Sequence, residues 1–170
     1  MRARAPRVRR PRLRSLFVLA LVLGGTASCG PPVDLEASLK VADVATGWFD
    51  EGIVNGQNKL VPSIAFTLIN QSDHRLSSVQ LNVVFRRAGE ADEWDAAYMR
   101  GIDTDGLEPG ASTARLVVRA KLGYTGDQPR AEMLQHPQFV DAKARIFAKH
   151  GSAQWVELGD FPIERQLLTR

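Results

Sequence analysis

The sequence predicts an all-β protein: a single antiparallel β-sandwich of about seven strands with one short helical turn, preceded by a signal peptide. Three observations predict this class. Apolar residues alternate with polar ones over short segments, which is the period of a strand with one face on a core and one in water. Clusters of Gly, Asn, Asp and Pro separate these segments. Only one short segment has helical character.

The first half of the predicted domain supplies three strands. We expect them at 35–41, 64–68 and 79–85, where apolar residues occupy every second position. Turn-forming residues fill 52–58 and 70–73. Each strand therefore presents one apolar face, and together these faces outline the core.

The second half supplies the other strands and the helical turn. The same alternation and the same turn residues predict strands at 94–100, 113–120, 140–148 and 154–161. We expect the helical turn at 129–135, because Pro129 suits a first helical turn and Pro137 stops the helix soon afterwards.

The first 28 residues have the layout of a secretory signal. Seven arginines and no acidic residue precede the apolar run from Leu16 to Leu23, and small residues follow it. The run is far shorter than the roughly 20 residues that cross a bilayer core. We therefore expect a signal peptide at 1–28, a short tether at 29–33 and one domain at 34–170.

Cys29 is the only cysteine, and it directly follows the small pair Ala27 and Ser28. This junction resembles the lipobox of bacterial lipoproteins. The resemblance implies cleavage before Cys29, acylation of the cysteine with palmitate-like chains, and a membrane anchor through the N-terminal lipid. Gly30 in the next position is similar to the pattern that sorts lipoproteins to the outer membrane. The alternative is a plain secreted protein with a free thiol.

The charge of the domain differs from that of the whole chain. The export segment holds 7 of the 22 Lys and Arg and none of the 19 Asp and Glu, so residues 29–170 carry 15 basic and 19 acidic side chains, a net charge of −4. A mildly acidic domain has no long-range attraction to phosphate backbones, which argues against nucleic acid as a partner. With one cysteine, an internal disulfide is impossible, and the domain must be stable through packing alone.

The segment 64–72, the strand at 79–85 and the turn Leu-Glu-Pro-Gly-Ala-Ser at 107–112 follow one another in a characteristic order. This order resembles that of immunoglobulin-like extracellular domains, and small bacterial surface domains of the FxLYD kind are similar. The resemblance covers residues 60–120. It implies an immunoglobulin-like sandwich and says little about activity, because such folds carry many functions.

The sequence contains no catalytic motif, so we expect neither an enzyme nor a cofactor. The histidines have no metal-ligand spacing and are interpreted as surface residues: His74, His136 and His150. The loop with Asp103, Asp105 and Glu108 is a weak metal candidate, because alternating carboxylates can ligate calcium. The alternative is an acidic hairpin loop whose aspartates bond their own backbone.

Five aromatic residues suggest a platform for sugar rings, because flat aromatic faces stack on the C–H surfaces of glycans. They are Trp48, Trp94, Trp155, Tyr98 and Tyr124. We expect Trp48 to lie exposed in the loop after the first strand. The alternative is that these residues fill the core, since Trp94 and Tyr98 share one face of a predicted strand.

A long connection at 122–139 carries apolar residues that a solvent-exposed loop without a structural or binding role would not need. Long structured loops on a rigid sandwich often bind partners, so Tyr124, Met133 and Phe139 are candidate contacts. The alternative is a loop that closes one open end of the sandwich and completes its core.

Together these patterns predict a non-catalytic, membrane-anchored lipoprotein of the bacterial cell envelope, at the outer membrane. Its sandwich is expected to bind protein or envelope components as an adaptor or scaffold. The alternative is a carbohydrate- or peptidoglycan-binding module that uses Trp48 and its neighbours.

Overall fold

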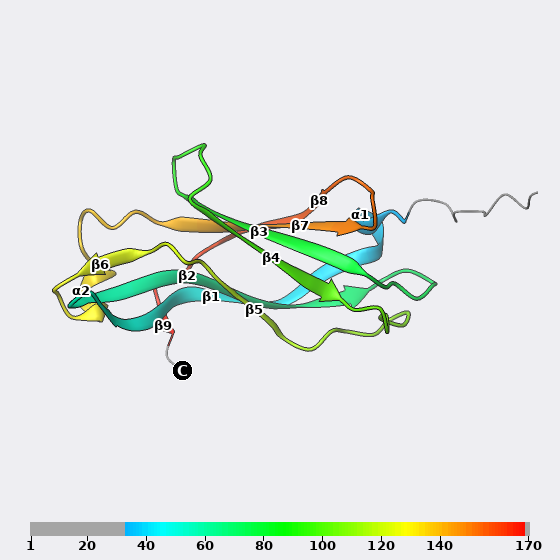
Figure 1. Cartoon of the computed structure of the whole chain (residues 1–170), viewed down its shortest axis with the longest axis horizontal. Coiled ribbons are helices and arrows are strands. Elements are labelled where there is room, and N and C mark those ends of the chain that lie inside the picture. Colours follow the sequence, from blue (N-terminus) through cyan, green and yellow to red (C-terminus); the bar gives the residue numbers. More distant parts are fainter. Residues whose placement is uncertain (1–32, 169–170) are drawn as a thin grey trace, which may run out of the picture. The chain divides into compact units, whose positions relative to one another are not determined.

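Two β-sheets pack face to face in the computed structural model, which describes residues 33–168 (Figure 1). The first sheet has the order β5 (Leu116–Arg119), β2 (Gln57–Asn70), β1 (Leu39–Val54) and β9 (Leu167–Leu168), and β6 (Tyr124–Gly126) also pairs with β2. The second sheet has the order β4 (Asp95–Ile102), β3 (Val79–Arg87), β7 (Ala142–His150) and β8 (Val156–Pro162).

The pairing confirms the predicted antiparallel sandwich. Every strand pair is antiparallel except β1 with β9, which is parallel. The neighbours β5-β2-β1 of the first sheet correspond to the E-B-A strands of immunoglobulin-like sandwiches, and the neighbours β4-β3-β7-β8 of the second sheet correspond to the C′-C-F-G strands. Within residues 33–168 there are nine strands instead of about seven, and the two that were not predicted are the short strands β6 and β9.

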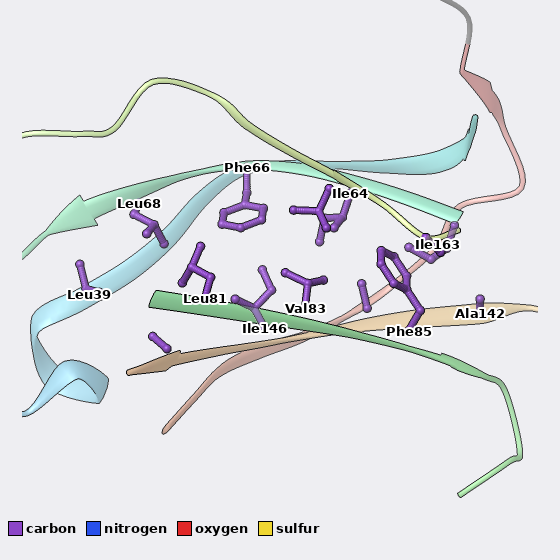
Figure 2. Close-up of a cluster of buried hydrophobic side chains, with 14 of the residues drawn as sticks. Leu39, Ile64, Phe66, Leu68, Leu81, Val83, Phe85, Ala142, Ile146 and Ile163 are labelled. Atoms are coloured by element: carbon purple, nitrogen blue, oxygen red, sulfur yellow. The ribbon is translucent and has the colours of Figure 1, made fainter. Parts of the chain in front are cut away.

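The core lies between the sheets, where alternate residues of β2, β3 and β7 point toward one another (Figure 2). All of these side chains are completely buried: Ile64, Phe66, Leu68, Leu81, Val83, Phe85 and Ile146. Burial of one side chain of this size contributes about 1.5–3 kcal/mol. The predicted inward positions of β2 and β3 are therefore confirmed.

The β1–β2 hairpin is longer, and its turn tighter, than the sequence predicted. Asn55 and Gly56 have φ of 52° and 84°, as a two-residue type I′ turn requires. Strand pairing continues up to Val54 and resumes at Gln57, so the predicted turn over 52–58 is wrong at both ends. Gly52, with φ of 89°, lies beside a register shift within β1.

The predicted strand at 35–41 is wrong for its first part, because Leu35–Ser38 forms the short helix α1. Asp34 caps this helix, and its Oδ1 accepts a hydrogen bond from the Ala37 amide at 3.2 Å. Leu35 and Leu39 are both buried and lie four residues apart, so the apolar contacts follow the helical period over this segment. Alternation of apolar residues alone could not separate the two cases.

The buried side chain of Asn70 joins the turn after β2 to the loop before β5. Its Nδ2 donates to the carbonyl oxygens of His74 at 2.9 Å and Leu107 at 2.8 Å. Its Oδ1 accepts from the amide of Ser72 at 3.0 Å and from the hydroxyl of Ser72 at 2.7 Å. One side chain thus satisfies four polar groups at this end of the sandwich.

The second helix, α2, covers Arg130–Met133 and begins directly after Pro129, within the predicted helical turn. Across residues 33–168, no helix has both the length and the apolar character needed to cross a membrane.

Candidate functional site

Trp48 lies in β1 and is completely buried, which corrects the expectation that it is exposed in a loop. Its ring packs against three other aromatic rings, with centroid distances of 6.3 Å to Trp94, 5.6 Å to Tyr124 and 4.5 Å to Phe139. These four residues form the aromatic cluster. A ligand cannot reach Trp48 without opening the core.

The aromatic cluster fixes the long connection at 122–139 onto the sandwich. Tyr124 begins β6, and its hydroxyl donates to the carbonyl oxygen of Val140 at 3.2 Å. Met133 of α2 and Phe139 are both buried. The connection therefore completes the core at this end, as the second of the two interpretations expected, and of the three candidate contact residues only Tyr124 keeps a half-exposed side chain.

Arg165 holds the end of the same connection in place. Its Nε donates to Asp141 Oδ1 at 2.6 Å, and its two terminal nitrogens donate to the carbonyl oxygens of Leu134 at 3.0 Å and Phe139 at 3.1 Å. The hydrogen bond that Arg165 donates to Asp141 raises the pKa of the Arg165 guanidinium. The guanidinium also lies 5.2 Å from the centre of the Phe139 ring.

The connection leaves an open pocket of about 400 Å³ on its outer side, which we call the end pocket. Its lining combines the candidate contact residues with a series of polar side chains: Gln57, Tyr124, Thr125, Gly126, Asp127, Gln128, Met133, His136, Gln138 and Phe139. The volume is in the range of pockets that hold small ligands or a few residues of a peptide.

The polar rim of the end pocket is organised by local hydrogen bonds. Gln57 Nε2 donates to Asp127 Oδ1 at 3.2 Å, which ties the start of β2 to the loop after β6. His136 Nδ1 accepts a hydrogen bond from the Gln138 amide at 3.2 Å, which leaves Nε2 as the other polar atom of the ring. Sequence patterns did not group Gln57 with Asp127, His136 and Gln138, because these residues come together only when 122–139 folds back on β2.

A second aromatic group lies on the outer face of the four-stranded sheet. Tyr98 of β4 is 71% exposed and Trp155, just before β8, is 36% exposed. Their ring centroids are 6.2 Å apart in an edge-to-face arrangement. Lys149 Nζ lies 5.1 Å from the centre of the Trp155 ring. The three tryptophans and two tyrosines of the sequence are thus divided between the core and this exposed pair.

The acidic loop at 103–108 directs its polar groups to arginines. Asp103 Oδ1 lies 3.4 Å from Arg100, and Glu108 Oε1 lies 3.6 Å from Arg75, which also donates to the carbonyl oxygen of Asp105. In the described part of the chain, no three His, Cys, Asp or Glu side chains are grouped so that they could hold a metal ion. The candidate set of Asp103, Asp105 and Glu108 is therefore not assembled as a metal site.

The candidate lipidation residue, Cys29, lies outside the described residues. Its acylation stays a prediction from the sequence.

No family model matches the sequence, and no curated protein matches it significantly. One similar solved structure is described as the X-ray structure of Northeast Structural Genomics Consortium target SoR45. It is 15% identical, with a TM-score of 0.44, and the alignment covers 76% of this chain and 88% of that chain. What the protein does must therefore be inferred from its own residues and contacts.

Proposed function

We propose that the protein is a non-catalytic lipoprotein of the bacterial cell envelope, anchored in the outer membrane through Cys29. Its sandwich binds a protein or another envelope component and acts as an adaptor or scaffold. The observation that carries this proposal is the end pocket, which combines an apolar floor with a polar rim. This combination is typical of binding sites.

The chemistry of the end pocket suits a neutral ligand rich in hydrogen-bonding groups. Gln57, Gln128 and Gln138 each carry an amide that both donates and accepts, as a peptide backbone does. Tyr124 and Phe139 supply the apolar floor. A short polypeptide segment of a partner protein fits both features, because its side chains can cover the floor while its backbone bonds the rim.

The anchor supports the proposal from the sequence side. The lipobox-like junction at Cys29 and the short tether at 29–33 are expected to keep the domain close to the membrane. A domain held there meets envelope partners at a high effective concentration, so weak contacts in a small pocket suffice for association.

In-cell photo-crosslinking tests this function. A photoreactive residue replaces Gln138 on the rim of the end pocket, and the control places it at Glu108, in the loop before β5. We expect Gln138 to capture one recurrent envelope protein, identified by mass spectrometry, and Cys29→Ala to abolish the capture. Equal capture at both positions, or capture unaffected by Cys29→Ala, contradicts the proposal.

A second candidate function is binding of peptidoglycan or another glycan, and the exposed pair Tyr98 and Trp155 favours it. Since Trp48 is buried, this platform replaces the one built on Trp48. Titration with peptidoglycan fragments would quench tryptophan fluorescence in the natural chain and leave it unchanged in Trp155→Ala. Absence of quenching in the natural chain rejects the glycan function.

A further inference from the structure

Cationic side chains gather on the outer face of the four-stranded sheet, away from the end pocket. Arg86 of β3 lies directly opposite Lys143 of β7 in the strand register. Arg145 follows two residues after Lys143 and therefore points to the same face. Like charges in directly opposite positions destabilise a sheet, so this arrangement costs the fold some stability.

Acidic side chains neutralise only part of this charge. Asp160 of β8 is shared, because its Oδ2 lies 3.1 Å from Arg145 and 3.7 Å from Lys143. Arg145 also lies 3.6 Å from Glu157, and its pKa is raised, chiefly by the hydrogen bond to Asp160. Lys143 and Arg145 therefore both have acidic partners.

Arg86 differs from its neighbours because it has no acidic partner. Within residues 33–168 its side chain makes no ion pair and no hydrogen bond. Its Nε is buried without an acceptor, as are the Nε atoms of Arg87 and Arg145, but those two guanidinium groups have acidic partners and that of Arg86 has none. A buried donor without a partner costs about 1–3 kcal/mol, so native structures rarely keep one without a reason. An anion from outside the chain would satisfy it.

A pocket of about 210 Å³ adjoins these side chains, and we call it the outer-face pocket. Val84 contributes to its lining, while Arg86, Lys143 and Arg145 lie around it. The charged residues that line it comprise four basic and two acidic ones, although residues 29–170 as a whole carry a net charge of −4. The positive charge is thus a local feature and not the average of a basic surface. The volume suits a single small group rather than a drug-sized molecule.

We propose that the outer-face pocket binds a phosphate group, either as free phosphate or as a phosphate ester. The lining residues carry a net charge of +2, which Glu157 beside Arg145 lowers to +1, and this excess of positive charge attracts an anion. Arg86 supplies the unpaired guanidinium, whose forked donors fit two phosphate oxygens. Lys143 adds a second positive charge from the opposite strand.

Isothermal titration calorimetry of the full chain in neutral detergent tests the site. The titrants are sodium phosphate and glycerol 3-phosphate, with glycerol as the uncharged control. We expect Arg86→Gln to weaken phosphate binding at least about tenfold, because charge-assisted hydrogen bonds are lost. The matched control Arg115→Gln, at an exposed arginine just before β5, should bind as the natural chain does.

A thermal melt without ligand shows whether a loss of binding is a loss of fold. Arg86→Gln should melt at or above the temperature of the natural chain, since the repulsion from Lys143 is relieved. Equal binding of both titrants assigns the site to phosphate in any form, and tighter binding of the ester assigns it to a phosphorylated headgroup or sugar. No binding of either anion, or equal weakening in Arg86→Gln and Arg115→Gln, overturns the proposal.

Discussion

Replacing Trp48 with alanine tests the division of the aromatic residues into a core cluster and an exposed pair. Trp48 is completely buried and contacts Trp94, Tyr124 and Phe139. Truncation of a buried tryptophan to alanine costs about 3–5 kcal/mol, through lost transfer free energy and the cavity that remains. Domains have free energies of unfolding of about 5–15 kcal/mol, so this is a large fraction of the total.

The loss translates into a fall of the melting temperature of about 9–15 °C, at about 3 °C per kcal/mol for a domain of this size. The substitution Trp48→Phe separates the contribution of ring packing to stability from that of the indole Nε1. Trp48 Nε1 is buried and has no hydrogen-bond partner within residues 33–168, so phenylalanine removes an unsatisfied donor together with part of the ring. These effects oppose each other, and we expect a net loss of less than about 1.5 kcal/mol.

Urea denaturation followed by far-ultraviolet circular dichroism measures these free energies without relying on the tryptophan that is changed. The matched control is Trp155→Ala, which loses an exposed edge-to-face contact with Tyr98 and costs about 1 kcal/mol. If Trp48→Ala costs no more than Trp155→Ala, Trp48 is not a core residue and the assignment of the two aromatic groups fails.

Three further substitutions give different readouts. Asn70→Ala leaves buried polar groups without partners and should lower the free energy of unfolding by about 3 kcal/mol in urea titrations. Arg165→Ala should expose residues 134–141 to limited proteolysis, and Arg165→Lys should not restore protection, because lysine cannot bridge three acceptors in one plane. The hydrogen bond that Asp73 accepts from His74 lowers the pKa of Asp73, so the contribution of Asp73 to stability is present above the ordinary carboxylate pKa of about 4 and is lost on acidification. Asp73→Asn should therefore flatten the acid side of the stability profile.

The sequence predicted the strands that have one face on the core and one in water. In β2 from Ile64 onward and in β3 from Val79 to Val83, alternate side chains are buried and those between them are more exposed, so the period of two is visible. The helical turn after Pro129 was also predictable, since proline fixes the geometry of a first turn.

The same reasoning failed where a strand is covered on both faces. Trp48 and Phe49 are adjacent in β1 and both are buried. Trp48 faces the core, whereas Phe49 is covered by the Arg119 guanidinium, which lies 3.4 Å from the centre of its ring, and β9 pairs with the edge of β1 at these two residues. These partners are remote in sequence, so the segment shows no alternation. The exposed loop predicted around Trp48 followed from that missing pattern.

The candidate sites were less predictable than the core, since each depends on register. Nothing in the sequence indicates that Arg86 faces Lys143, because the pairing of β3 with β7 decides it. The candidate contacts Tyr124, Met133 and Phe139 were found from a local excess of apolar residues, yet their neighbours Gln57 and the 125–128 loop come together only through the pairing of β6 with β2.

The outer-face pocket lowers the stability of the fold, whereas the core raises it. The chain has one cysteine and must be stable through packing, and apolar side chains fill the alternate inward positions from 64 to 68 in β2 and from 79 to 85 in β3. Opposed like charges cost roughly 0.2–1 kcal/mol, and an unpartnered guanidinium nitrogen adds to this. Proteins tend to break local rules where function requires it. The placement of Arg86 opposite Lys143 departs from these rules. An anion bound between the two side chains would relieve their repulsion, and the free energy gained would contribute to the affinity for the anion.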